Sequence, residues 1–211
     1  GGLGMDQATA ASIMAIYGSL VYLSSVVGGW LSDRVWGSRK TVFIGGVLIM
    51  FGHIALSLPA GVAALYVSIA LIVVGTGLLK PNVSEMVGGL YSPDDERRDS
   101  GFSMFVFGIN LGAAVAPWAV PWAANGFGFH LFGNEMNFHA GFSLAAIGMF
   151  FGLLQYTLDG RKYLSKDSLY PNDPIEKDDL RPIIIWTLVG VAVLVVVLGL
   201  LAAMGQLNIT N

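Results

Sequence analysis

One lysine of this sequence lies inside a long apolar stretch, where a charge is costly. Lys80 lies in Val74-Gly-Thr-Gly-Leu-Leu-Lys-Pro-Asn82. If that stretch is a helix ending near Tyr91, Lys80 lies roughly 16 Å from its end at about 1.5 Å per residue. A lysine at this depth costs about 2.5 to 3.5 kcal/mol and normally faces a cavity or a carboxylate. Snorkelling to the surface is the alternative, but the reach is long. We therefore expect Lys80 to bind an anionic group.

Two other polar residues in apolar segments are candidates for the same site. Asn110 lies in Gly108-Ile-Asn-Leu-Gly112, a spacing of small residues that lets another helix approach. It is explained equally well by a hydrogen bond between helices and by a substrate contact. Tyr22 could line a pore, although most buried tyrosines are core residues. Glu85 is about 140° around the helix from Lys80, so we expect the lysine's partner to be a substrate or a residue outside this sequence.

A dense polar turn follows the first apolar segment. Asp33 and Arg34 end that segment, Gly37 permits a sharp turn, and Arg39 with Lys40 begins the next segment. A carboxylate can therefore meet basic groups and a helix N-terminus across the turn. Such a cluster could lock one conformation and release it in another. The alternative is a solvated loop that only sets the topology.

The composition predicts that membrane-spanning helices position these residues. The chain has 211 residues, of which 55% are hydrophobic and 12% charged, whereas soluble domains carry about 25% charged residues. An ordinary cytosolic enzyme is excluded. With no cysteine and three scattered histidines, we expect no metal site, and there is no phosphate-binding loop motif for ATP. Six apolar segments are long enough to cross a hydrocarbon core of about 30 Å, at 7–32, 41–58, 62–91, 101–124, 140–158 and 182–204. The predicted fold class is an all-α membrane protein.

The basic residues predict the orientation of these segments. All lysines and arginines except Lys80 lie after the first, third or fifth segment, and the loops 59–61 and 125–139 contain none. By the positive-inside rule the basic loops are cytoplasmic, which places the N-terminus outside. Because a cytoplasmic start would need one more helix, and because no initiator methionine is present, we interpret the sequence as a fragment of a longer protein.

Several motifs resemble one transporter family. They are Gly28-Gly-Trp-Leu-Ser-Asp33 followed by Gly37 and Thr41-Val42, Gly75-Thr-Gly-Leu-Leu-Lys-Pro-Asn-Val-Ser84, the stretch from Phe105 to Gly112, and His139-Ala-Gly-Phe-Ser-Leu-Ala-Ala-Ile-Gly148. Together they resemble the proton-dependent oligopeptide transporters, a branch of the major facilitator superfamily. The resemblance implies proton-coupled symport of di- and tripeptides across the cell membrane by alternating access between two six-helix bundles. It implies a secondary transporter and not an enzyme, with no cofactor apart from the proton gradient.

The resemblance also implies an organisation for the chain. Residues 1–160 correspond to family helices two to six of the N-terminal bundle. Residues 161–181 correspond to a cytoplasmic linker, and residues 182–211 to the first of two extra helices between the bundles. The expected partners are the missing first helix, the C-terminal bundle, peptides, protons and membrane lipid, but no nucleic acid.

Roles for individual residues follow from the same resemblance. Lys80 matches the family lysine that works with glutamates of the first helix and with the carboxyl end of the peptide. Asn110 and Tyr22 match pocket residues near the peptide backbone. The cytoplasmic turn that gates the superfamily is matched by five residues, Asp33, Arg34, Gly37, Arg39 and Lys40.

The sequence also departs from the family. The E-x-x-E-R motif of the family's first helix is absent, so the proton-coupling carboxylates are not in this chain. Two alternatives stay open, because fold alone does not fix function. One is a transporter of nitrate or another small anion, for which Lys80 would serve equally well. The other is a membrane scaffold or peptide sensor that transports nothing.

Overall fold

The structure is a computed structural model that describes residues 7–58, 61–92, 94–126 and 138–176, together with Pro182 and Ile185. The chain divides into two units, residues 1–173 and residues 174–211. Within the described part of the first unit the order is α1 (Gln7–Leu31), a π-helix η1 (Ser32–Trp36), α2 (Ser38–Ser57), α3 (Gly61–Gly88), α4 (Arg97–Gly126), α5 (Phe138–Tyr163) and a 3₁₀ turn η2 (Asp167–Leu169). In the second unit Pro182 and Ile185 are helical.

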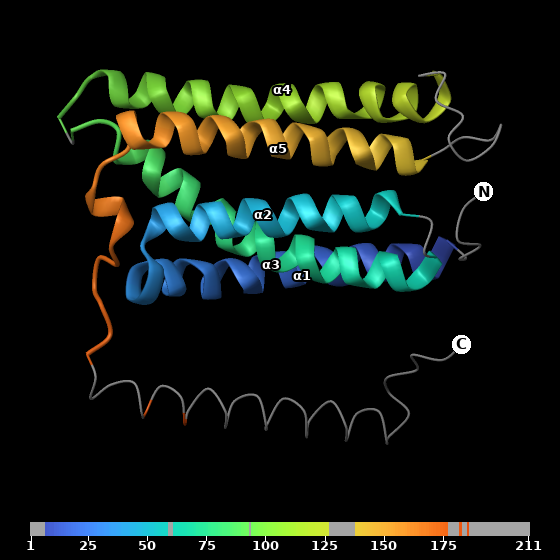
Figure 1. The fold of residues 1–211 in the computed structure, drawn as a ribbon, viewed down its shortest axis with the longest axis horizontal. Coiled ribbons are helices and arrows are strands. Elements are labelled where there is room, and N and C mark those ends of the chain that lie inside the picture. Colours follow the sequence, from blue (N-terminus) through green and yellow to red (C-terminus); the bar gives the residue numbers. More distant parts are fainter. Residues whose placement is uncertain are drawn as a thin grey trace. The chain divides into compact units, whose positions relative to one another are not determined.

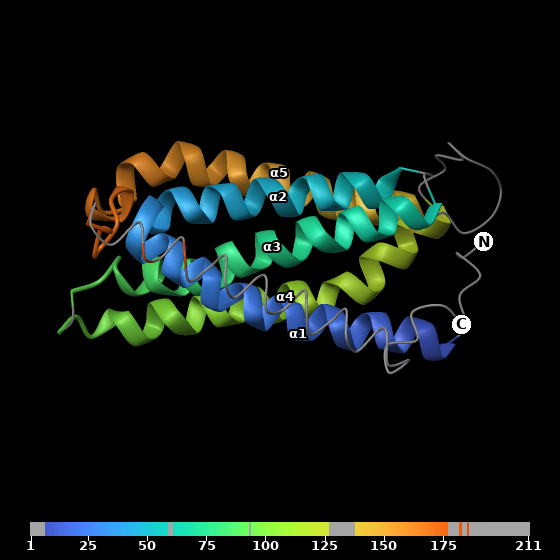
Figure 2. The ribbon, with the colours of Figure 1, turned by 90° about the horizontal axis from the view of Figure 1, so that it is seen from below.

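Five long helices lie side by side in the first unit (Figures 1 and 2). The main packing pairs are α1 with α3, α3 with α2, α2 with α5, and α5 with α4, while α3 and α4 touch over a short length. The α1–α2 turn, the α3–α4 loop and the end of α5 lie at one end of the unit (Figure 1), which we call the basic end because it carries Arg34, Arg39 and Lys40.

All five helices are long and apolar enough to cross a membrane. The predictions of an all-helical membrane protein and of the first five spans are confirmed. The sixth predicted span, 182–204, lies outside the described residues except at Pro182 and Ile185. The observed bounds differ by a few residues: α3 ends at Gly88 and not at Tyr91, and α4 begins at Arg97 and not at Gly101. Helix ends project beyond the hydrocarbon core, so charged residues there need not end the helix.

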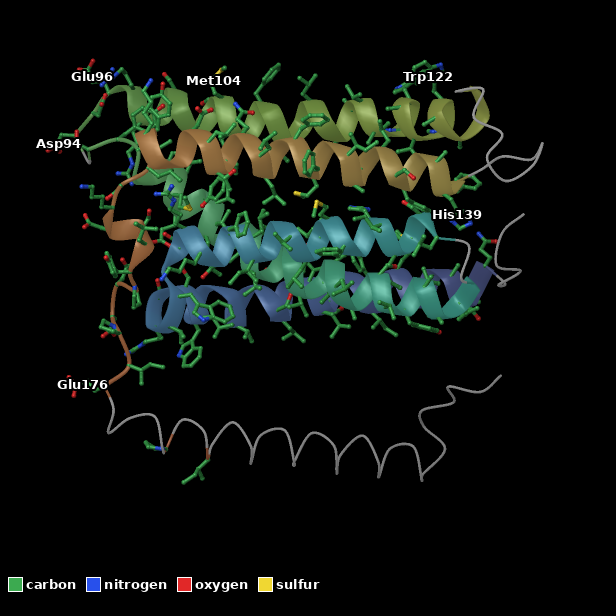
Figure 3. All side chains as sticks on the ribbon, in the orientation of Figure 1. Asp94, Glu96, Met104, Trp122, His139 and Glu176 are labelled. Carbon is green, nitrogen blue, oxygen red and sulfur yellow. The ribbon has the colours of Figure 1, made fainter. Side chains whose placement is uncertain are left out.

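Apolar side chains cover much of the outer surface of the unit. On α4, the side chains of Met104 and Trp122 are 71% and 61% exposed, and both project away from α5 in Figure 3. On α1, Tyr22 and Val26 are more than two-thirds exposed. A soluble monomer rarely shows apolar surface on this scale, whereas lipid or further helices cover it in a membrane protein.

The Asp95 carboxylate and Arg97 interact at the N-terminus of α4. One carboxylate oxygen of Asp95 accepts hydrogen bonds from the backbone N–H of Arg97 at 2.9 Å and from its Nε at 3.0 Å, and the other oxygen accepts from Nη2 at 2.8 Å. The hydrogen bond from the Arg97 side chain is the largest cause that lowers the pKa of Asp95 from 3.8 to about 2. The carboxylate therefore stays ionised at neutral pH and holds the first turn of α4.

We expect the substitution Asp95→Asn to lower the thermal stability of the whole protein slightly at pH 7. Because folding lowers the pKa of Asp95, the contribution of its carboxylate is present above the unfolded value of 3.8 and is lost as the pH falls through about 2. Thermal unfolding in detergent from pH 7 to pH 2 checks this. A difference between the two proteins that is as large at pH 2 as at pH 7 would contradict it.

Candidate functional site

Lys80 and Tyr22 lie together on the surface of the unit. The Lys80 ammonium is 5.2 Å from the centroid of the Tyr22 ring, within cation–π range. Both side chains are exposed in the first unit, Tyr22 by 70%. Two residues that the sequence analysis selected separately are therefore neighbours, one from α3 and one from α1.

A close crossing of α1 and α3 places these residues beside each other. A Cβ atom on Gly28 would overlap the backbone carbonyl of Gly77, so the two backbones are in contact there. One turn away, the Ser24 hydroxyl donates a hydrogen bond to the carbonyl of Val73 at 2.9 Å. Small residues at such a crossing allow close helix packing within a membrane. The position of Lys80 relative to Tyr22 is therefore fixed by backbone contacts.

Asn82 fastens the same crossing and was missed by the sequence analysis. Its side chain is 1% exposed, and its amide nitrogen donates to the carbonyls of Leu78 at 2.6 Å and of Gly28 at 3.2 Å. Pro81 has no N–H and cannot donate within the helix. A polar amide beside this proline, two residues after a charged residue in an apolar helix, was the signal that could have identified Asn82.

No carboxylate of the described residues lies within 4 Å of the Lys80 ammonium. Glu85, the nearest acid along α3, instead accepts a hydrogen bond from the Asn172 amide at 3.0 Å. This agrees with the expectation that Glu85 does not neutralise Lys80. The Lys80 ammonium therefore offers a positive group that the described part of the chain leaves unpaired.

Asn110 lies on α4, and no described contact links it to Lys80 or Tyr22. Its side chain is exposed, and its amide donates to the carbonyl of Val106 on the same helix at 2.8 Å. This bond does not decide between a helix contact and a substrate contact. The pocket role of Asn110 stays a prediction.

The predicted gating turn is held by the segment that follows α5. The backbone N–H of Asp173 donates to the carbonyl of Asp33 at 2.9 Å, and the Asp173 carboxylate pairs with Arg34 at 2.9 Å. Asn172 donates to the Asp33 carboxylate at 3.3 Å, as well as to Glu85. At Gly37, where φ is +79°, a Cβ atom would come within 2.8 Å of the Tyr170 backbone. The turn therefore makes several contacts with the segment after α5, while the Arg34 and Asp173 side chains stay 40% and 67% exposed, and its gating role stays a prediction.

Arg39, another basic residue of the turn, lies against α5. The hydroxyl of Tyr156 on α5 donates to the carbonyl of Arg39 at 3.0 Å. A Cβ atom on Gly160 would come within 3.2 Å of an Arg39 guanidinium nitrogen, so this side chain lies against α5. Arg39 is therefore oriented by the helix that packs beside it.

We expect Tyr156→Phe to destabilise the protein by about 1 kcal/mol, because one partly buried hydrogen bond to Arg39 is lost while the ring stays. Thermal unfolding in detergent measures the effect. Tyr163→Phe on the same helix is the control, since that side chain is 63% exposed. Equal stabilities of the two variants would show that the Tyr156 hydrogen bond contributes nothing.

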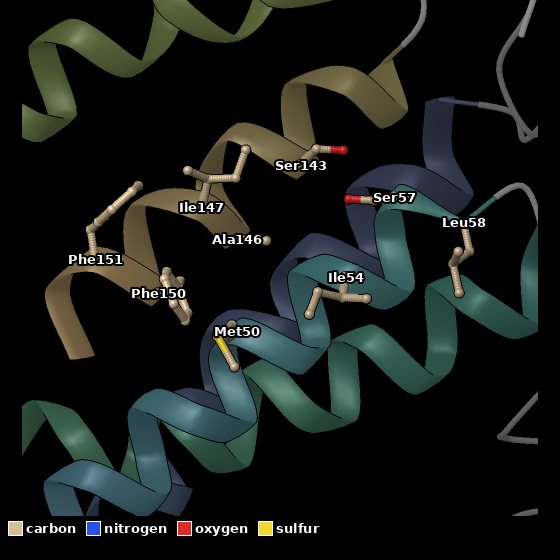
Figure 4. Close-up of a pocket in the computed structure, with 9 residues that line it drawn as sticks. All are labelled: Met50, Ile54, Ser57, Leu58, Ser143, Ala146, Ile147, Phe150 and Phe151. Carbon is tan, nitrogen blue, oxygen red and sulfur yellow. The ribbon is translucent and has the colours of Figure 1, made fainter. Parts of the chain in front are cut away.

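An apolar cavity of about 630 Å³ between α2 and α5 is a poor candidate for a polar substrate (Figure 4). Phe150 of α5 points toward Met50 of α2, and Ile54 and Ile147 also line the cavity. Its two hydroxyls, Ser57 and Ser143, already donate to carbonyls of their own helices at 2.8 Å. A polar ligand needs a few free polar groups that fix its orientation. The Lys80 and Tyr22 surface remains the candidate site.

Comparisons with known proteins agree with these features. The model of the POT family matches residues 39–207. The chain is 76% identical over 189 residues to a di-/tripeptide transporter of Lactobacillus helveticus, which covers 90% of this chain and 38% of that protein. It is 44% identical over 210 residues to a di-/tripeptide transporter of Lactococcus lactis subsp. lactis (strain IL1403), with 100% and 40% covered.

Solved structures show the same relationship. A crystal structure of a peptide transporter POT in complex with sulfate superposes with a TM-score of 0.83 at 50% identity, and covers 97% of this chain and 40% of that one. A POT family transporter in complex with a thioalcohol-conjugated peptide superposes with a TM-score of 0.83 at 42% identity, with 98% and 40% covered. The chain thus spans about two fifths of the length of the relatives that it matches.

Proposed function

The chain belongs to the POT family, and from this premise we propose that the whole protein is a proton-coupled symporter of di- and tripeptides that works by alternating access. The single observation that carries the proposal from the structure is the Lys80 ammonium beside Tyr22, which no carboxylate of the described residues neutralises, at a close crossing of two helices long enough to span a membrane. A peptide carboxylate is a suitable partner for such a lysine. The relatives named di-/tripeptide transporters support peptides as the substrates.

The proposed site consists of Lys80, Tyr22 and Asn110, completed by parts of the protein outside this chain. Lys80 binds the peptide carboxyl end, and Tyr22 and Asn110 contact the peptide backbone. Carboxylates on a further helix take up the proton, since the described residues offer none beside Lys80. No cofactor is required, because the proton gradient is the driving force.

The proposed arrangement places residues 1–160 in the N-terminal bundle, residues 161–181 in a linker and residues 182–211 in an inter-bundle helix. The protein lies in the cell membrane with its basic end in the cytoplasm, following the positive-inside rule. The gating turn at Asp33, Arg34, Gly37, Arg39 and Lys40 is then cytoplasmic. Its contacts with the segment after α5 allow these elements to move as one body between the inward and outward states.

Coupling requires that peptide and proton each bind the two states with different affinity. In the proposed cycle Lys80 pairs with a carboxylate in one state and with the peptide in the other. A protonated carboxylate releases Lys80 to the peptide, so both ligands favour the same transition. A symporter, unlike a sensor, must complete this cycle and return empty.

Uptake of labelled dialanine into liposomes containing the whole protein tests the proposal, with and without an inward proton gradient. Uptake that depends on the gradient is expected. Labelled nitrate in the same liposomes tests the anion alternative. Gradient-driven nitrate uptake without peptide uptake would replace peptide by anion as the substrate, and peptide binding without uptake would indicate a sensor.

A further inference from the structure

A second cavity at the basic end combines cationic and apolar walls. It has a volume of about 420 Å³ and lies between the start of α2 and the end of α5. Arg39 and Lys40 contribute the cationic wall, and Phe43, Ile44, Tyr156 and Leu169 contribute most of the rest. The cavity is separate from Lys80, which does not line it.

The two cations of this cavity lack an acidic partner. Among the described residues, no carboxylate lies within 4 Å of the Arg39 guanidinium or the Lys40 ammonium, whereas the neighbouring Arg34 pairs with Asp173. The Arg39 side chain is held against α5 near Gly160. The N-terminus of α2, which begins at Ser38, adds the positive end of a helix dipole. The Arg39 guanidinium, the Lys40 ammonium and the N-terminus of α2 all favour an anion in the cavity.

The apolar walls and the location narrow the kind of anion. The span of α2 begins at Ser38, and the span of α5 ends at Gly160. The cavity therefore lies at one end of both membrane-spanning helices. From there Phe43, 39% exposed, and Ile44 continue along α2 into the span. A ligand with a charged head and an apolar tail matches both walls. Basic pockets between membrane helices bind the headgroups of anionic lipids by this combination.

We propose that Arg39 and Lys40 bind the phosphate-bearing headgroup of an anionic phospholipid, with one acyl chain lying along Phe43 and Ile44 between α2 and α5. The lipid occupies the boundary where the basic end of the bundle meets the membrane surface. The lipid contacts two of the five residues of the gating turn, Arg39 and Lys40, from the side of the bundle that faces the membrane. The site does not depend on which substrate the protein transports.

The test measures lipid binding to the purified whole protein, without transport. Native mass spectrometry counts bound lipids while detergent solutions are titrated with dioleoyl phosphatidylglycerol or dioleoyl phosphatidylcholine. Each basic residue near an anionic headgroup is worth about five-fold in affinity. The wild type is therefore expected to prefer phosphatidylglycerol by about ten-fold or more, and the double variant Arg39→Gln/Lys40→Gln is expected to lose that preference.

Two further variants serve as controls. Lys162→Gln, at the same end of α5, removes an exposed charge outside the cavity and should keep the preference. Arg39→Lys/Lys40→Arg keeps both charges, so it should also keep most of the preference. If Arg39→Gln/Lys40→Gln fails to fold, the charge-swapped variant is compared with the single variant Lys40→Gln, which removes the exposed charge alone. The single variant should then show the weaker preference for phosphatidylglycerol, and equal preferences would contradict the proposal.

Two results would overturn the proposal. One is an undiminished preference for phosphatidylglycerol after the loss of both charges. The other is displacement of the bound lipid by millimolar inorganic phosphate alone, which would identify a site for free anions. Because binding is measured directly, neither result depends on whether the protein transports peptides.

Discussion

Replacing Lys80 with alanine in the whole protein is expected to lower gradient-driven dialanine uptake by about 100-fold or more. The proposed cycle needs a positive group that exchanges between a carboxylate and the peptide, and the described residues supply no other cation at this depth. Losing an interaction made by a charged group in a desolvated site costs several kcal/mol, and about 1.4 kcal/mol is a factor of ten. Uptake into proteoliposomes with an imposed proton gradient measures the effect.

The control for Lys80→Ala is Lys162→Ala, which removes an exposed lysine at the end of α5. It should transport at the wild-type rate. Thermal unfolding of both variants shows whether a loss of uptake reflects misfolding. A well-folded Lys80→Ala protein that accumulates dialanine as the wild type does would remove Lys80 from the mechanism.

The substitution Gly28→Ala is expected to destabilise the bundle by about 1 to 3 kcal/mol, the usual cost of overpacking a tight contact. The added methyl group would overlap the backbone carbonyl of Gly77, which cannot move away as a flexible side chain can. The helices would have to separate, and the contacts of Ser24 with Val73 and of Asn82 with Gly28 would weaken. Lys80 and Tyr22 would then lose their fixed relation, so uptake should fall as well.

Gly18→Ala on the same helix is the matched control. Apart from the neighbouring backbone of α1 itself, no heavy atom of the described residues lies within 4 Å of a Cβ built at Gly18. Because alanine favours helix over glycine by up to about 1 kcal/mol, this variant should be as stable as the wild type or slightly more stable. Thermal unfolding of both variants in the same detergent checks the pair. Equal effects at Gly18 and Gly28 would show that helix propensity, and not the crossing, determines the result.

Sequence patterns predicted the helices well because a bilayer leaves few alternatives. Long apolar runs must form helices there to satisfy their backbone groups, so the five described spans could be predicted from length and hydropathy. The ends of the helices were less predictable. The predicted gating turn contains a π-helix at Ser32–Trp36, and α2 already begins at Ser38, three residues before the predicted start. Neither feature has a hydropathy signal.

The candidate site was predictable only in part. The depth of Lys80 in an apolar segment was a strong signal, and the nearness of Tyr22 could not be derived without knowing which helices cross. Asn82 and Asn172 were not selected. The amide beside Pro81 was a local signal for Asn82, but its partner Gly28 lies 54 residues away, and the partners of Asn172 lie 139 and 87 residues away. Such contacts depend on the packing of the helices and not on local pattern.

The packing also sets where the Lys80 backbone lies beside α1. The α1–α3 crossing is fastened at Ser24, at Asn82 and, towards the basic end, by the bridge of Asn172 between Asp33 and Glu85. These contacts lie at three levels along the two helices. The structure thus provides a physical connection between the turn and the candidate site.

The most direct test of peptide–proton symport measures proton entry that is caused by peptide. Liposomes containing the whole protein and a pH-sensitive dye are given an inside-negative potential without a pH gradient, and dialanine is then added outside. The proposed mechanism predicts prompt acidification of the interior with the wild type and none with Lys80→Ala. Accumulation of dialanine without any acidification would contradict it.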